Sequence, residues 1–138
     1  MLQIVDDVGL SEFIRHQPAG FGAELLPGGK NIPRSVIAKI LLARAVASEP
    51  SLLALEEPLG NLNFRDRLQI GRMLIDPNRQ WTLVCATEDP LLASLCGRVL
   101  VLKEGEIIFD GSFDALKKTP HYERIFRENL EKENSQLV

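Results

Sequence analysis

The chain has 138 residues, of which 45% are hydrophobic and 25% charged, a size and composition typical of one globular domain with an ordinary core. A formal net charge of −3 and few aromatic residues argue against a surface for nucleic acid. No apolar run is long enough to span a bilayer, so direct insertion into a membrane is not expected.

The predicted elements alternate between helices and strands. A short helix is predicted over 8–15, and a glycine-rich loop then leads to a helix over 33–48. The side chains predicted to share the buried face of this second helix are Val36, Ile37, Ile40, Leu41 and Ala45. Strands are predicted over 52–55, 81–86, 98–102 and 106–109, and further helices over 64–75, 90–95, 113–117 and 120–133.

This alternation predicts an α/β domain with a mainly parallel sheet flanked by helices, followed by a small C-terminal hairpin and helix. In such sheets ligands bind at the carboxyl ends of the strands. Two predicted strands end in acids at that place: "LLALEE" ends in Glu56 and Glu57, and "LVCATED" ends in Glu88 and Asp89. The sequence therefore predicts a site at this edge of the sheet.

The segment "GGKNIPRSVIAKILLARAVASEPSLLALEEPLGNLN" resembles the middle of an ATP-binding cassette (ABC) ATPase domain. In that family a signature helix and "ARA" precede a Walker B strand and a D-loop. "CATEDPLLASLCGRVLVLKEGEIIFDGSFDAL" is similar to the end of the domain, and "VGLSEFIRHQPAGFGAELLPGG" resembles the helical subdomain of exporter-type members. The resemblance covers residues 8–116 and implies the C-terminal half of a P-loop-NTPase-like domain.

The resemblance also implies a division of the chain and roles for several residues. Residues 1–49 would be a helical-subdomain remnant with the signature helix, 50–118 a partial ATPase core and 119–138 a C-terminal helix. The signature Leu-Ser-Gly-Gly-Gln falls on residues 32–36, which puts Arg34 and Ser35 at nucleotide-binding positions. An ordinary helix start with a solvated arginine is the alternative there.

The Walker B strand carries the two acids. Glu56 falls on the Walker B aspartate, which orients Mg²⁺ through water, and Glu57 falls on the catalytic base of the family. Glutamate at the first of these positions keeps the charge but displaces the carboxylate, on a geometry that Mg²⁺ holds strictly. Glu57 is thus the one matched residue whose chemistry is kept.

Other family positions are altered. The switch histidine, a nucleotide-binding position, falls on Glu88, whose negative charge would repel phosphate. The D-loop aspartate falls on Asn63, for which helix capping is the alternative role. "PGGKN" lacks the spacing of the phosphate loop G-x-x-x-x-G-K-[ST], and no other segment of the sequence matches that loop.

These alterations predict a degenerate ABC-type ATPase half-domain, part of or derived from the nucleotide-binding subunit of a transporter, without hydrolysis on its own. Mg-ATP is the family's ligand, and we expect this chain alone to bind none. One alternative is a fragment of a longer ABC ATPase that binds and hydrolyses ATP with a partner domain. Another is a protein-interaction module on the same scaffold that has lost nucleotides.

A half-domain would leave a sheet edge and apolar surface open. The expected partners are therefore a phosphate-loop-bearing ATPase domain, a membrane permease, or a second copy of the chain. The expected location is the cytoplasm, at the membrane through a partner. Tyr122, Ile125, Phe126 and Leu130 have helical spacing and would cover the chain's own domain or dock on a partner.

Overall fold

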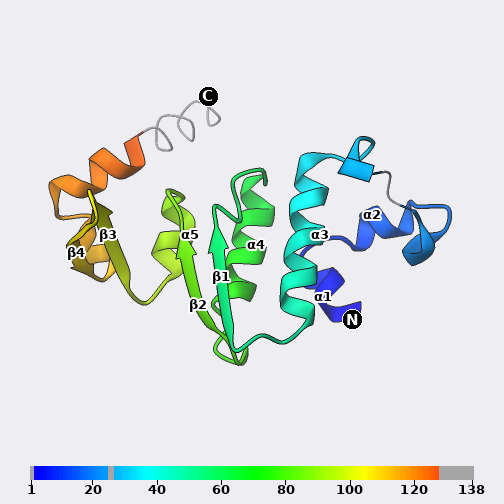
Figure 1. Cartoon of the computed structure of the whole chain (residues 1–138), viewed down its shortest axis with the longest axis horizontal. Coiled ribbons are helices and arrows are strands. Elements are labelled where there is room, and N and C mark those ends of the chain that lie inside the picture. Colours follow the sequence, from blue (N-terminus) through cyan, green and yellow to red (C-terminus); the bar gives the residue numbers. More distant parts are fainter. Residues whose placement is uncertain (1, 25–26, 128–138) are drawn as a thin grey trace. The chain divides into compact units, whose positions relative to one another are not determined.

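The computed structural model of the chain describes residues 2–24 and 27–127, in two compact units, Met1–Cys85 and Ala86–Val138 (Figure 1). The three-part division suggested by the resemblance stays a prediction. None of the described helices is long and apolar enough to cross a membrane. The elements are α1 (Leu2–Asp7), α2 (Ser11–Arg15), η1 (Gly20–Gly22), η2 (Pro27–Gly29), α3 (Arg34–Ala47), β1 (Leu52–Glu56), α4 (Phe64–Leu74), β2 (Thr82–Ala86), α5 (Pro90–Leu95), β3 (Val99–Lys103), β4 (Glu106–Gly111) and α6 (Phe113–Leu116).

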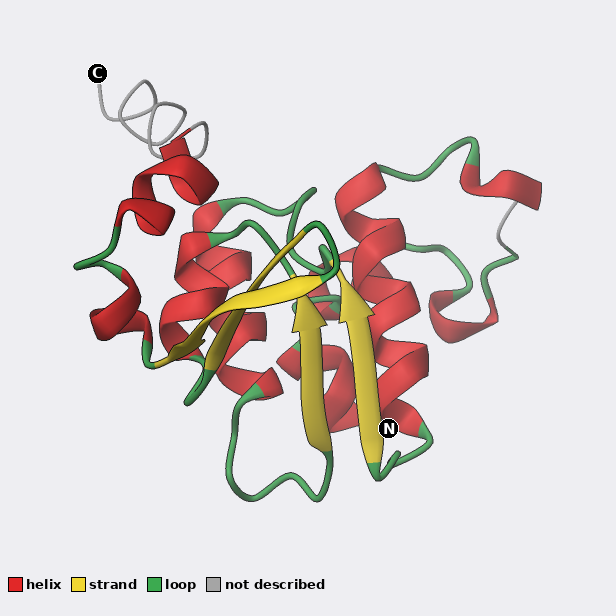
Figure 2. Ribbon diagram, turned by 60° about the vertical axis from the view of Figure 1, so that its left-hand side comes forward, coloured by secondary structure: helices red, strands yellow, loops and turns green. Residues whose placement is uncertain are grey.

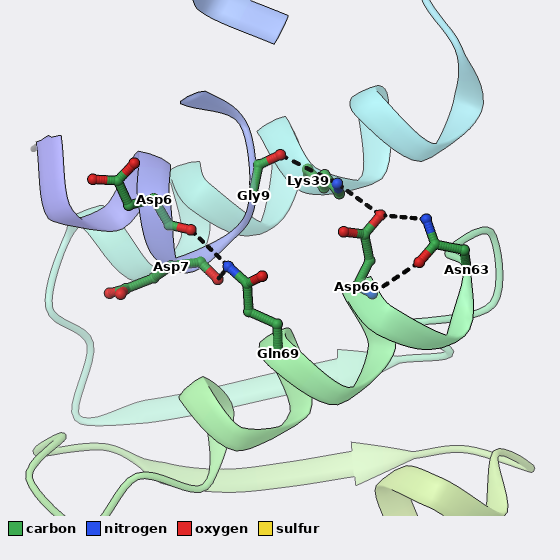
Figure 3. A network of polar contacts seen from close by, with 7 residues as sticks. All are labelled: Asp6, Asp7, Gly9, Lys39, Asn63, Asp66 and Gln69. Atoms are coloured by element: carbon green, nitrogen blue, oxygen red, sulfur yellow. Dashed lines mark hydrogen bonds and ion pairs between the residues drawn. The ribbon is translucent and has the colours of Figure 1, made fainter. Parts of the chain in front are cut away.

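The first unit is built on a two-stranded sheet of β1 and β2, whose strands run in the same direction (Figure 1). The backbone N–H of Thr82 donates to the carbonyl of Ser51, 2.8 Å away, where the two strands begin. Helix α4 lies over this pair, with α1 and α3 beyond it (Figure 3). Together with the hairpin of the second unit, this arrangement confirms the predicted α/β class and its small parallel sheet.

The first unit corrects two predictions about its helices. The helix predicted over 8–15 is only α2, because the chain turns between α1 and α2 at Gly9, which has a φ of 69° that glycine adopts without strain. In α3 the predicted face is wrong: Leu41 is exposed, whereas Leu42 and Val46 are buried. Apolar residues surround most of this helix, so their spacing does not select one face.

The second unit has a hydrophobic cluster of its own. Strands β3 and β4 form an antiparallel hairpin, and its side chains pack with α5 and α6 around the buried residues Ala93, Val101, Phe113, Leu116 and Phe126. Residues 120–127 are helical, and Tyr122, Ile125 and Phe126 pack into this cluster. The described part of the C-terminal helix thus covers its own domain, as the first of the two expectations stated. Leu130 lies outside the described residues.

The turn of the hairpin offers a first testable prediction. Lys103 pairs with Glu106, and the two residues between them, Glu104 and Gly105, have φ angles of 51° and 84°. A two-residue loop with both φ angles positive favours Asn-Gly over Glu-Gly. We expect Glu104→Asn to raise the free energy of unfolding by about 0.5 kcal/mol. Urea titration measures this change. The control is Lys103→Asn, which should not stabilise the protein, because Lys103 has a β-strand backbone.

Candidate functional site

The acids of the predicted Walker B strand lie at its end. Glu56 is the last residue of β1, and Glu57 follows it with a φ of 39°. Both side chains are exposed. A left-handed conformation costs a non-glycine residue about 1 kcal/mol, so the fold holds the backbone at Glu57 against a local preference. The turn directs the chain from the strand into the loop that leads to α4.

That loop is held by its own side chains. Leu59 and Leu62 are buried beneath it. Asn63 is the N-cap of α4: its side-chain oxygen accepts from the backbone N–H of Asp66 at 2.9 Å, and its amide donates to the Asp66 carboxylate at 2.9 Å. This reciprocal pair satisfies a backbone donor that the helix leaves unpaired. The predicted capping role of Asn63 is confirmed.

The matched signature residues begin α3. Pro33 occupies the N-cap position and no side chain caps this helix. Arg34, the first helical residue, is exposed, and Ser35 is half-buried. The start of α3, the start of α4 and the end of β1 all lie at the same end of the first unit (Figure 1). The structure thus gathers Arg34, Ser35, Glu56 and Glu57 at one end of this unit.

The second unit holds the acids that follow β2. Glu88 is exposed, whereas Asp89 is buried and caps α5. The Asp89 carboxylate accepts from the backbone N–H of Leu91 at 2.8 Å and of Leu92 at 3.4 Å. Its own N–H donates to the hydroxyl of Thr87 at 3.0 Å. Asp89 is therefore a structural cap of α5.

A buried lysine joins the elements of the first unit, and the sequence interpretation missed it. Lys39 is only 8% exposed. Its ammonium lies 2.8 Å from the Asp66 carboxylate and donates to the carbonyl of Gly9 at 3.2 Å (Figure 3). Asp66 is in turn held by Asn63. Two signals in the sequence point to this network. One is the single lysine in an otherwise apolar stretch of α3, and the other is the Asn-x-x-Asp spacing at the start of α4.

The same network continues toward α1. The side-chain amide of Gln69 donates to the carbonyls of Asp6 at 2.7 Å and Asp7 at 3.2 Å, at the end of α1 (Figure 3). The Asp7 carboxylate also forms an ion pair with Arg79, which lies over the ring of Trp81. Trp81 donates to the carbonyl of Leu74 at 2.9 Å. Polar contacts thus tie α1, α3 and α4 into one body.

Mg-ATP, the ligand that the resemblance implies, does not fit the described residues by themselves. Mg²⁺ in nucleotide sites is held by one or two carboxylates together with phosphate oxygens. Glu56 offers one exposed carboxylate, and among residues 2–24 and 27–127 no three His, Cys, Asp or Glu side chains gather as a metal site. A phosphate held here would need donors from another segment or another chain.

Known proteins similar to this chain belong to ABC transporters, although no protein-family model matches it. A lipoprotein-releasing system ATP-binding protein, LolD, from Nitratidesulfovibrio vulgaris is 36% identical over 107 residues, which are 76% of this chain and 41% of that protein. An aliphatic sulfonates import ATP-binding protein, SsuB, from Mycobacterium avium is 34% identical over 134 residues, covering 91% of this chain and 49% of that protein.

A solved structure shows the same fold. The chain superposes on a bacterial Atm1-family ABC exporter with ATP bound with a TM-score of 0.81, at 18% identity, over 93% of this chain and 23% of the exporter chain. The chain spans less than half the length of the two curated relatives described above. These comparisons confirm the resemblance to the C-terminal half of an ATP-binding domain.

Proposed function

We propose that the chain is a degenerate half-domain without hydrolysis of its own. It is related to the ATP-binding subunits of ABC transporters and corresponds to the C-terminal half of their ATPase domain. Its role is structural or allosteric, beside a domain that carries a phosphate loop. It lies in the cytoplasm and reaches the membrane through such a partner or a permease.

The start of α3 is the observation that carries this proposal. In the family this helix start binds phosphate through a serine hydroxyl and glycine N–H groups. Here Pro33 occupies the N-cap, which removes a donor, and the exposed side chain of Arg34 replaces a glycine that allows close approach. The altered acid at Glu56 and the negative charge of Glu88 support the same conclusion.

Calorimetry with Mg-ATP tests the proposal. We expect the 138-residue chain to bind Mg-ATP no more tightly than about 1 mM, because a phosphate would gain few donors here. The intact LolD relative, titrated under the same conditions, is the control for an active preparation. A micromolar dissociation constant for this chain would exclude the proposed loss of nucleotide binding.

A second candidate is a fragment of a longer ABC ATPase that binds and hydrolyses ATP with a partner domain. The length of the relatives favours it, since the matched part is 41% of LolD and 49% of SsuB. In this case Glu57 is the general base that activates the attacking water. Glu57→Gln in the longer protein should then lower kcat by at least about a hundredfold. An unchanged kcat would remove Glu57 from that role.

A further inference from the structure

The first unit contains a cavity that the candidate site does not use. It has a volume of about 250 Å³ and lies between α3 and the segment that runs from α1 through α2 to η1. Helix α2 and the turn η1 lie on the side of α3 away from β1 and β2 (Figure 1, Figure 2). Because its walls come from several elements, this space is a hollow and not a flat helix face.

The floor and walls of the cavity are apolar. Val5 and Leu10 are buried and form its floor. Ile40 and Ala43, three residues apart on α3, share one face of that helix and are only half-buried. Phe21 lies at the mouth and is 62% exposed. Apolar surface that the fold leaves partly open to water thus surrounds the cavity, and a molecule that covers it would gain free energy.

Small residues keep the cavity open. Gly20, Ala23 and Ala43 all lie in its wall. A Cβ atom added at Gly20 would meet no heavy atom within 4 Å beyond its chain neighbours. Larger side chains at these positions would fill the space from the wall. The composition of the wall therefore leaves room for a molecule of matching size.

The polar groups at the cavity are few. Among the described residues that line it, none has a charged side chain, and only Gln17 has a polar one. The backbone N–H of Gly20 donates to the carbonyl of Gln17 at 3.0 Å, and that of Ala23 donates to the carbonyl of Gly20 at 3.2 Å. These donors are already used within the chain. A charged molecule would therefore lose its hydration here without gaining a counter-charge.

We propose that this cavity binds a neutral, largely apolar molecule of one or two rings with at most one hydrogen-bonding group. An apolar cavity of about 150 Å³ holds one benzene molecule, so the volume found here corresponds to about ten non-hydrogen atoms. Gln17 supplies the side chain that can pair with a single polar atom. Neither Arg34 nor Glu56 lines the cavity, so the proposal is independent of the proposed function.

The size of the cavity favours a small molecule over a partner helix. A helix that docks in a groove inserts a row of apolar side chains spaced over two turns. A volume of about 250 Å³ admits about one large side chain. A single ring system fills such a space completely, whereas a helix would leave most of its apolar face outside it.

Titration of the 138-residue chain with indole tests the proposal. Indole is neutral, has two fused rings and carries one N–H donor. We expect a dissociation constant of about 0.1–1 mM, as for a ligand of about ten non-hydrogen atoms in an apolar site. Amide chemical shifts in residues 10–23 and 40–43 should move with the same saturation curve. Benzoate, which is similar in size but charged at pH 7, should bind at least about tenfold more weakly.

Two matched pairs of variants locate the bound molecule. Ala43→Leu fills the cavity and should weaken indole binding at least about fivefold. Ala47→Leu makes the same change at an exposed position of α3 outside the cavity and should not alter binding. Phe21→Ala removes part of the mouth and should weaken binding at least about threefold. Phe64→Ala, at a residue of similar exposure on α4, is its control.

Each result has a defined meaning. Weakening by Ala43→Leu and Phe21→Ala, with unchanged binding in both controls, supports the cavity as the site. Because Phe21 is exposed, its variant keeps the test decisive if Ala43→Leu does not fold. No binding of indole at 5 mM, about five times the weakest expected dissociation constant, overturns the proposal. Equal weakening within either pair, or benzoate binding as tightly as indole, also overturns it. A dimer of the chain that Ala43→Leu dissociates overturns it too, since a second copy then occupies the cavity.

Discussion

Replacing Asp66 by asparagine is expected to lower the free energy of unfolding by about 3 kcal/mol, because it leaves a buried ammonium without its counter-charge. The Lys39 ammonium lies 2.8 Å from the Asp66 carboxylate, and the two side chains are only 10% and 18% exposed. Asparagine keeps the volume of the side chain. It also leaves the backbone N–H of residue 66 free to donate to Asn63 as before. Urea unfolding monitored by circular dichroism measures the loss.

Two further variants make this result specific. Lys39→Met combined with Asp66→Asn should recover most of the loss, because neither charge is then buried alone. Asp114→Asn breaks the exposed pair with Lys117 and should cost about 0.5 kcal/mol or less. If Asp66→Asn is no more costly than Asp114→Asn, the buried pair does not hold the first unit together.

The position of this pair gives it a functional consequence. Lys39 lies on α3, a little over one turn after Arg34 and Ser35, and Asp66 lies in the first turn of α4. Breaking the pair should therefore loosen the starts of both helices, where the matched site residues lie. We expect faster amide hydrogen exchange in residues 57–66 of the Asp66→Asn variant.

Phe113→Ala is expected to lower the stability of the second unit by about 3–4 kcal/mol. Phe113 is buried at the start of α6, and its ring lies 5.8 Å from that of Tyr122 and 5.9 Å from that of Phe126, edge to face in both pairs. Its loss leaves a cavity in the middle of the cluster and removes both ring contacts. Hydrogen exchange in β3, β4 and residues 120–127 should become faster.

A matched control exists in the first unit. Phe64, the first residue of α4, is 60% exposed, and Phe64→Ala should change stability by about 0.5 kcal/mol or less. The same change of side chain is thus compared at a buried and at an exposed position. Equal effects of the two substitutions would show that the aromatic cluster is not the core of the second unit.

Local signals explain why most elements could be predicted. Helix α5 is predicted with its observed bounds, 90–95, and the structure supplies the local reason: Asp89 caps the helix and Pro90 stands in its first turn. The start of α4 after Asn63 follows from the same chemistry. The strands are short apolar runs between turns, and the order of motifs indicated the family before the comparisons confirmed it.

Contacts across long sequence separations explain what the prediction missed. Lys39 is buried because Asp66 and Gly9 meet it, and those residues lie far from it along the chain. The buried face of α3 depends on the position of α1, which the apolar residues around α3 do not encode by spacing alone. The nucleotide-binding, metal-binding and catalytic roles of the matched residues stay predictions. These residues are Arg34, Ser35, Glu56, Glu57 and Glu88.

The sequence by itself indicated the kind of most elements and the family that the chain resembles, because these depend on residues that are neighbours or stand in a fixed order, but it did not predict helix α1 (Leu2–Asp7). Only the tertiary structure decided that Lys39 and Asp66 form a buried ion pair, and that Leu53 is buried while Leu52 and Val84 are exposed. Burial depends on what packs against a residue, and alternation along a strand predicts two faces without saying which of them is covered.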